Sequence, residues 1–167
     1  MAAKAKVSAA KQVIDILAER NQTIVTAESC TGGLIAATLT DIPGASAALY
    51  GGFVTYANAA KSRMIHVQPR LINDYGAVSN QVARAMADGA RNTVHADFAV
   101  AATGIAGPDG GSDKKPVGLV YVAVSSSLAT VVIEHRFGDL GRDGIRKATV
   151  EAALDLVLQV VTSDPPQ

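Results

Sequence analysis

The sequence predicts an α/β fold: a single-domain, three-layer sandwich in which a mixed β-sheet is flanked by helices. Short Val-rich segments alternate with segments that carry apolar residues at helical spacing, as expected for strands separated by helices. Around 117–137 two strand-like segments follow one another directly, and this predicts an antiparallel hairpin. The chain has 167 residues, of which 49% are hydrophobic, and this suits one core and excludes a disordered chain. We therefore expect one domain over 1–167, with its core at about 8–162.

The helices are predicted from apolar residues that recur with helical spacing and from the residues that bound each segment. Ser8 and Ser79 are placed to cap two of them, and Pro69 is placed to open a third. Pro43–Gly44 and Gly76 follow two of these segments and are expected to end them. The expected helices are 8–20, 34–40, 57–64, 69–75, 79–95 and 142–161.

The strands are predicted from short apolar segments. The expected strands are 23–27, 49–56, 97–102, 117–125 and 130–137. Gly51–Gly52 lies within the second one and suggests a bulge or a close approach of neighbouring backbone. The Gly- and Pro-rich loop 103–116 separates the third and fourth strands. Loops of this length inside compact domains are usually functional or mobile, so the alternatives here are a ligand-binding loop and a plain surface loop.

The composition of the chain limits the classes of partner that we expect it to bind. Fifteen Lys and Arg balance fifteen Asp and Glu, and this argues against a general nucleic-acid binder, which needs a basic excess. The single Cys cannot form an internal disulfide, and no secretory signal or membrane-spanning run is recognisable, so we expect a cytoplasmic protein without a membrane partner. The three His show no ligand spacing, so we expect no metal site.

The strand, turn and helix at 23–39 form the first candidate for chemistry. Ser29 lies in the turn, and Thr31, Gly32 and Gly33 open the helix. Small residues let a ligand approach the backbone, and a helix start offers unpaired N–H groups to an anion or a developing oxyanion. The ordinary alternative is that these residues only cap the helix and form a tight turn.

The second candidate is the pair of Tyr56 and Lys61. Desolvation lowers the pKa of a lysine on an apolar-flanked stretch, and a neutral amine can take a proton from a serine hydroxyl. A tyrosine nearby can relay or donate a proton. The alternative is a solvated Lys61 on a helix and a Tyr56 that is simply a strand aromatic.

The third candidate is the start of the loop 103–116. Thr103 and Gly104 at the strand end could offer hydroxyl and amide donors to a phosphate. Arg142 and Arg146 lie one helical turn apart in the last helix, where they could bind a phosphate or simply solvate the helix start.

Several linked segments occur here in one order: Ala27–Gly33, Pro43–Gly44, Gly51–Tyr56, Lys61, Gly76–Ser79, Ala102–Pro108 and Lys115–Gly118. Together they resemble the CinA C-terminal-domain family, which includes the PncC-type nicotinamide-nucleotide amidases. The resemblance covers about 8–162, and the ordered set is far more specific than any one segment.

The resemblance implies an enzyme that hydrolyses the carboxamide of nicotinamide mononucleotide to nicotinic acid mononucleotide and ammonia, in pyridine-nucleotide recycling. Ser29 matches the nucleophile, Lys61 the base, and Tyr56 a proton relay. We expect the amides near Thr31, Gly32 and Gly33 to hold the oxyanion. No cofactor is implied.

Further residues are expected to bind the substrate, which is a small-molecule nucleotide. These are Thr31, Gly32, Gly33, Asn58, Thr103, Gly104 and Arg142. Two alternatives stay open: a nucleotide-binding module without turnover, and a competence-associated partner protein. A homodimer is also an expectation, because a small α/β domain of this kind can expose apolar strand or helix faces.

Overall fold

A five-stranded mixed sheet with the order β2-β1-β3-β4-β5 forms the centre of the molecule. The computed structural model describes residues 7–165, so the outermost residues of the predicted domain, 1–6 and 166–167, lie outside the described part. The first three strands in the chain, β1 (Ile24–Glu28), β2 (Leu49–Val54) and β3 (Phe98–Gly104), are mutually parallel where they pair. The hairpin of β4 (Leu119–Ser125) and β5 (Thr130–Arg136) adds antiparallel strands, as predicted.

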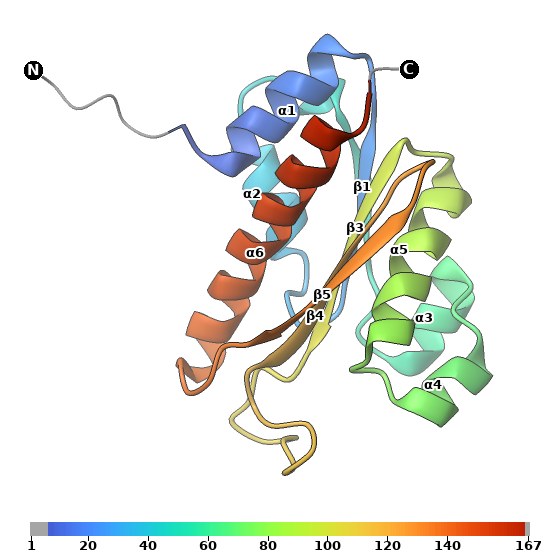
Figure 1. The fold of residues 1–167 in the computed structure, drawn as a ribbon, viewed down its shortest axis with the longest axis vertical. Coiled ribbons are helices and arrows are strands. Elements are labelled where there is room, and N and C mark those ends of the chain that lie inside the picture. The colour runs from blue at the N-terminus through green and yellow to red at the C-terminus, as the bar shows by residue number, and fades with distance from the viewer. Residues whose placement is uncertain (1–6, 166–167) are drawn as a thin grey trace, which may run out of the picture.

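Helices cover both faces of the sheet, and the predicted three-layer sandwich is confirmed (Figure 1). One layer consists of α1 (Ala9–Glu19), α2 (Leu34–Thr40) and α6 (Gly141–Ser163), with a short 3₁₀ turn at Ala45–Ala47. The opposite layer consists of α3 (Asn58–Ile65), α4 (Pro69–Tyr75) and α5 (Asn80–Val94). Two apolar cores follow, one on each side of the sheet. None of the helices within 7–165 is long and apolar enough to cross a membrane.

The helix boundaries follow local chemistry. The side chain of Ser8 accepts from the amide of Lys11, and that of Ser79 accepts from the amide of Val82, so both predicted caps are confirmed. Pro69 begins α4, where its missing N–H would have no partner anyway.

The third strand extends further than predicted. Thr103 and Gly104, expected to open a loop, pair with Tyr121 and Val120 and belong to β3. The end of β3 therefore lies beside the start of its antiparallel partner β4, and no local sequence signal marks that point. Packing explains why residue 104 is a glycine, because a Cβ there would lie 2.5 Å from the side chain of Val120.

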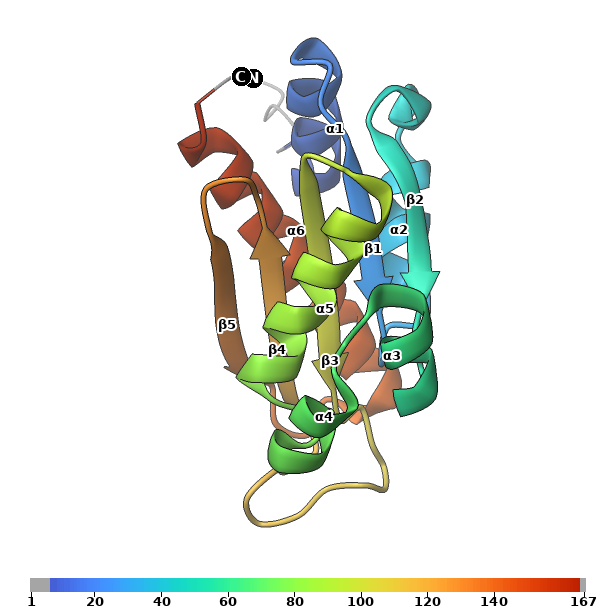
Figure 2. The same cartoon turned by 90° about the vertical axis from the view of Figure 1, so that its right-hand side faces the viewer.

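Parallel pairing brings the carboxyl ends of β1, β2 and β3 to one edge of the sheet. Figure 2 shows their arrowheads pointing to the same end, next to the connection between β3 and β4. In parallel α/β sheets this is the edge at which ligands bind. The predicted turn after β1 and the predicted Tyr56–Lys61 segment after β2 therefore meet in space.

Gly52 illustrates how tightly the edge strand is fitted. It pairs with Thr26 of β1, and a Cβ on Gly52 would lie 2.4 Å from the hydroxyl of Thr26. Gly52, for which the sequence suggested a close approach of neighbouring backbone, therefore leaves room for the buried side chain of Thr26.

We expect Gly52→Ala to lower the free energy of unfolding by about 2 kcal/mol, because overpacking forces neighbouring atoms apart. In a Thr26→Ala background, where the clashing hydroxyl is gone, the same change is expected to cost clearly less. Urea unfolding of the four proteins measures both costs. Equal costs in the two backgrounds would show that the hydroxyl is not the obstacle.

Candidate active site

A cavity of about 210 Å³ lies at the carboxyl ends of the three parallel strands. It brings together most of the predicted site residues. Its lining consists of Ser29, Cys30, Tyr56, Asn58, Lys61, Ala77, Val78, Thr103, Gly104, Ala106 and Arg142. Thr31, Gly32 and Gly33 are not among the lining residues and form the turn that follows Ser29.

Ser29 and Lys61 form the centre of this cavity. Lys61 Nζ lies 3.1 Å from Ser29 Oγ, within hydrogen-bond distance. The same nitrogen donates to the carbonyl oxygen of Thr55 at 2.9 Å and to that of Tyr56 at 3.1 Å. The two residues are 32 positions apart in the chain, and the pairing of β1 with β2 brings them together.

The Lys61 side chain is buried, with only 1% of the residue exposed. Burial lowers the pKa of Lys61 below its ordinary value, because removal from water penalises the charged amine. A neutral amine has two N–H donors and one lone pair, and the two carbonyl oxygens match the two donors. The lone pair is then available to the hydroxyl proton of Ser29.

Tyr56 contributes to the site through its backbone as well as its ring. Its carbonyl oxygen accepts from Lys61, whereas its side chain is 60% exposed. Arg142 donates from Nη2 to the Tyr56 hydroxyl at 3.1 Å and from Nη1 to the carbonyl of Gly107 at 2.7 Å. Arg142 therefore links α6 to the β2–α3 connection and to the loop after β3.

The start of α2 differs from the prediction of unpaired N–H groups. The buried carboxylate of Glu28 accepts from the amides of Ile35 at 2.8 Å and Ala36 at 3.1 Å, and also from the Thr26 hydroxyl. The helix therefore already has an anionic cap supplied by β1. Sequence reasoning missed Glu28, although an acidic residue that ends an apolar strand just before Ser29 is a signal of such a role.

The turn itself provides fewer amides than expected. The amide of Gly32 donates to the carbonyl of Ser29 at 3.1 Å and is used within the turn. Among residues 7–165, the amides of Thr31 and Gly33 have no hydrogen-bond partner. These two amides are unpaired within the turn, but neither residue is among those that line the cavity.

Arg146 fixes the same turn from the opposite side. Its guanidinium donates from Nε to the carbonyl of Cys30 and from Nη2 to that of Thr31, both at 3.1 Å. Arg142, which was expected to bind the substrate, therefore lines the cavity, whereas Arg146 holds the backbone next to Ser29.

The remaining residues take different places. The hydroxyl of Thr103 donates to the carbonyl of Ala77 at 2.9 Å, and this joins β3 to the segment before α5. Asn58 lies at the start of α3 and lines the cavity. Cys30 is buried, and burial raises the pKa of its thiol to about 11, so it is a poor nucleophile at neutral pH. No cluster of His, Cys, Asp or Glu suited to a metal ion occurs within the described residues.

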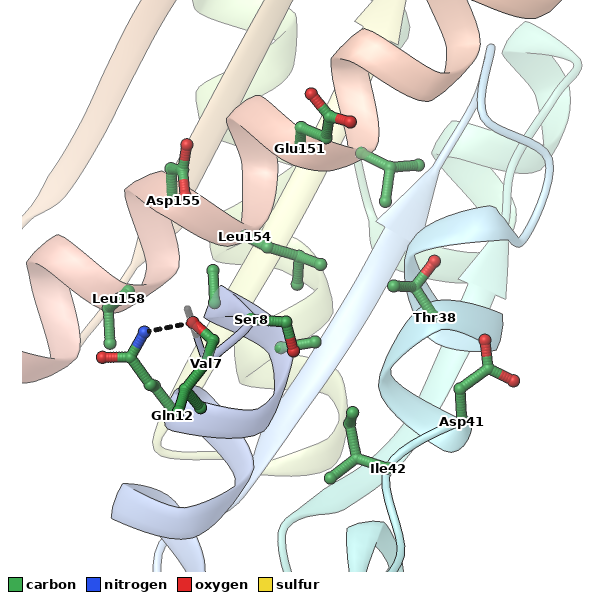
Figure 3. Close-up of a pocket in the computed structure, with 13 residues that line it drawn as sticks. Val7, Ser8, Gln12, Thr38, Asp41, Ile42, Glu151, Leu154, Asp155 and Leu158 are labelled. Carbon is green, nitrogen blue, oxygen red and sulfur yellow. Dashed lines mark hydrogen bonds between the residues drawn. The ribbon is translucent and has the colours of Figure 1, made fainter. Parts of the chain in front are cut away.

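A second cavity, of about 630 Å³, lies away from this edge, among α1, α2 and α6 (Figure 3). Apolar side chains such as Leu154 and Leu158 and the carboxylates of Asp41, Glu151 and Asp155 line it. It contains neither a nucleophile with a base nor a basic side chain. Its size therefore does not make it the better candidate for chemistry.

An α/β sandwich with a buried Ser–Lys pair at the carboxyl edge of its parallel strands is thus the class of protein defined by fold and site. The model of the CinA C-terminal domain matches residues 6–161. A CinA-like protein of Geobacter sulfurreducens is 52% identical over 143 residues, which are 86% of this chain and 34% of the relative. The chain belongs to the CinA C-terminal domain family.

Solved structures agree with this assignment. The competence/damage inducible protein CihA of Agrobacterium tumefaciens has a TM-score of 0.89 and 48% identity, with 92% of this chain and 93% of that chain covered. A CinA superfamily protein of Escherichia coli has a TM-score of 0.87 and 32% identity, with 91% and 88% covered. The chain spans about a third of the length of the curated relatives it matches, 36% for one from Acetivibrio thermocellus.

The buried amine predicts how stability depends on pH. The pKa of Lys61 is lowered in the folded state, whereas in the unfolded chain it stays near 10.5. Between these two values the unfolded chain binds more protons, so the free energy of unfolding rises with pH. Relative to Lys61→Met, we expect the wild type to gain up to about 1.4 kcal/mol per pH unit in this window.

Urea unfolding between pH 7 and 10.5 measures this difference. Lys11→Met, which removes an exposed amine on α1, serves as the matched control and is expected not to reproduce the upward trend. If the wild type and Lys61→Met gave parallel curves across the window, the amine would not be shifted by burial.

Proposed function

We propose that the protein is a nicotinamide-nucleotide amidase that uses Ser29 as nucleophile and Lys61 as general base. The observation that carries the proposal is the distance of 3.1 Å between Lys61 Nζ and Ser29 Oγ inside a cavity at the sheet edge. A serine hydroxyl is a weak nucleophile unless an adjacent base takes its proton, and a desolvated lysine can be that base.

The reaction divides into two acyl transfers. Lys61 Nζ takes the hydroxyl proton as Ser29 Oγ bonds to the carboxamide carbon, and the carbonyl electron pair moves to oxygen. The C–N bond of this tetrahedral species then breaks, and the nitrogen leaves as ammonia with the proton from Lys61 or one relayed by Tyr56. Water, deprotonated by Lys61, cleaves the acyl-enzyme and gives the carboxylate product. The net change is carboxamide plus water to carboxylate plus ammonium.

The backbone around the pair supports this chemistry. The carbonyl oxygens of Thr55 and Tyr56 fix the two N–H donors of Lys61 and so direct its lone pair towards Ser29. The amides of Thr31 and Gly33, which have no partner among the described residues, are candidates for the oxyanion. Glu28 and Arg146 hold this turn from two sides, so its geometry is set before substrate binds.

The cavity lining suggests how a nucleotide would lie. Next to Ser29 and Lys61 the walls are backbone and small side chains, which suits a flat carboxamide ring. Arg142 is exposed at the side of the cavity and supplies a fixed positive charge for a phosphate. Asn58, Thr103 and Gly104 line the same cavity and provide polar groups for the ribose.

A competence-associated role is the second candidate, because similar proteins of known structure are named for competence or damage. Fifteen basic and fifteen acidic residues give no net charge for direct DNA contact. A mobility-shift assay with double- and single-stranded DNA tests this role, and we expect no shift at physiological salt.

We expect Ser29→Ala and Lys61→Met each to lower the release of ammonia from nicotinamide mononucleotide by about 10³-fold or more, because each removes half of the nucleophile–base pair. Ammonia and the carboxylate product are measured together, with and without a chelator. Ser62→Ala, on the same helix as Lys61 but outside the cavity lining, is the control and is expected to keep full activity. Activity that survives Ser29→Ala would remove the nucleophile, and activity lost to the chelator would point to a metal.

Arg146 yields a separate expectation. Arg146→Ala should lower kcat about 10²-fold with a smaller change in KM, because it releases the turn that carries Ser29, while Arg146 itself is not among the residues that line the cavity. Arg146→Lys should recover only part of the loss, since one ammonium cannot reproduce the fork that holds two carbonyl groups. Steady-state kinetics with Lys147→Ala, the exposed neighbour, as control measures this effect. An unchanged kcat in Arg146→Ala would mean that the turn keeps its shape without the guanidinium.

A further inference from the structure

The outer edge of β5 is an unpaired strand edge. Figure 2 shows β5 at the border of the sheet, and within residues 7–165 no other strand pairs with its outer side. The bonds from Phe137 N to Gly118 O at 2.9 Å and from Ser126 N to Ala129 O at 3.0 Å fix which β5 residues bond to β4. Because bonded and non-bonded pairs alternate, Val132, Glu134 and Arg136 direct their N–H and C=O groups outwards.

Several features that usually protect an edge strand, such as a short length, a Pro or a β-bulge, are missing from β5. It has seven residues, contains no Pro or Gly, and keeps a regular register with β4 throughout. Val131 and Ile133 are 39% and 38% exposed, because α6 packs on β3 and β4 and leaves this face of β5 largely uncovered, whereas α5 packs on the other face. The opposite edge strand, β2, is less suitable, since its register shifts at Ile24/Val25 beside Gly51.

The order of charges on β5 allows two copies of the strand to pair with opposite charges facing each other. Glu134 and Arg136 lie two residues apart on the same face of the sheet and form an exposed ion pair at 2.7 Å. When two copies of such a strand run antiparallel about a two-fold axis through His135, each Glu134 lies opposite the partner's Arg136. The four charges then alternate in sign around the axis.

We propose that two copies of this chain associate through antiparallel pairing of their β5 strands about a two-fold axis at His135, forming one continuous sheet. The outward groups of Glu134 and Arg136 then bond to those of the partner. On the face towards α6, Ile133 lies opposite the partner's Phe137, so that an exposed apolar side chain is covered.

Other registers fit less well. An axis through Glu134 would place two carboxylates directly opposite each other. An axis through Ile133 would pair Arg136 with the partner's Thr130, whose carbonyl is already bonded to Arg84 at 2.7 Å. At the chosen axis the two His135 side chains face each other, and burial lowers the pKa of His135, which favours the uncharged form of both.

Sedimentation equilibrium over a range of protein concentrations tests the proposal. The wild type is expected to dimerise. Arg136→Glu and Glu134→Arg each place like charges opposite one another, and each should raise the dissociation constant at least about tenfold. An equimolar mixture of these two variants should recover association, because Arg then faces Glu at every position across the axis. The double exchange Glu134→Arg/Arg136→Glu should recover it as well.

Two controls distinguish a loss of β5 pairing from a general effect of charge or of unfolding. Arg70→Glu breaks an exposed ion pair on α4 and should leave association unchanged, and thermal unfolding confirms that every variant is folded. A wild type that stays monomeric at all concentrations would overturn the proposal. A dimer that the single exchanges do not weaken, or one that the mixture does not restore, would place the contact on another surface and overturn it equally.

Discussion

The hydrogen bonds of one buried amine join the separate parts of the site. Lys61 reaches from α3 to the backbone that follows β2 and to the hydroxyl that follows β1, so three segments of the chain converge on one nitrogen atom. Such a group would be costly inside a protein if it were charged and unpaired. Burial therefore favours its neutral form, and the surrounding carbonyl groups fix its direction. The nucleophilic role that we propose for Ser29 depends on this arrangement.

The turn that carries Ser29 is fixed on both sides by charged groups that do not line the cavity. Glu28 binds the first amides of α2, and Arg146 binds the carbonyl groups of Cys30 and Thr31. The scaffold thus uses an anion for backbone donors and a cation for backbone acceptors. Both side chains act through the main chain, and together they leave Ser29 in a defined position at the end of a rigid parallel strand.

Much of this architecture is predictable from local patterns, because helix caps, apolar spacing and short Val-rich segments all act within a few residues. The pairing of Ser29 with Lys61 was implied by the resemblance to the CinA C-terminal-domain family, because the two residues lie on different segments and local patterns do not connect them. Glu28 was missed because its partners, the amides of α2, meet it only after the chain has turned. The roles of Arg142 and Arg146 could not be separated by spacing, since their partners come from distant segments. The length of β3 depends on β4, which follows a long loop.

The two hydrogen bonds of Arg142 connect separate segments of the chain through one side chain. One guanidinium ties the hydroxyl of Tyr56 to the carbonyl of Gly107, and both bonds depend on the same few rotatable bonds. A rotation of this single side chain therefore breaks both hydrogen bonds together and separates the β2–α3 connection from the loop after β3. The link between these two segments can thus form and break on the timescale of a surface rotamer, without a domain motion.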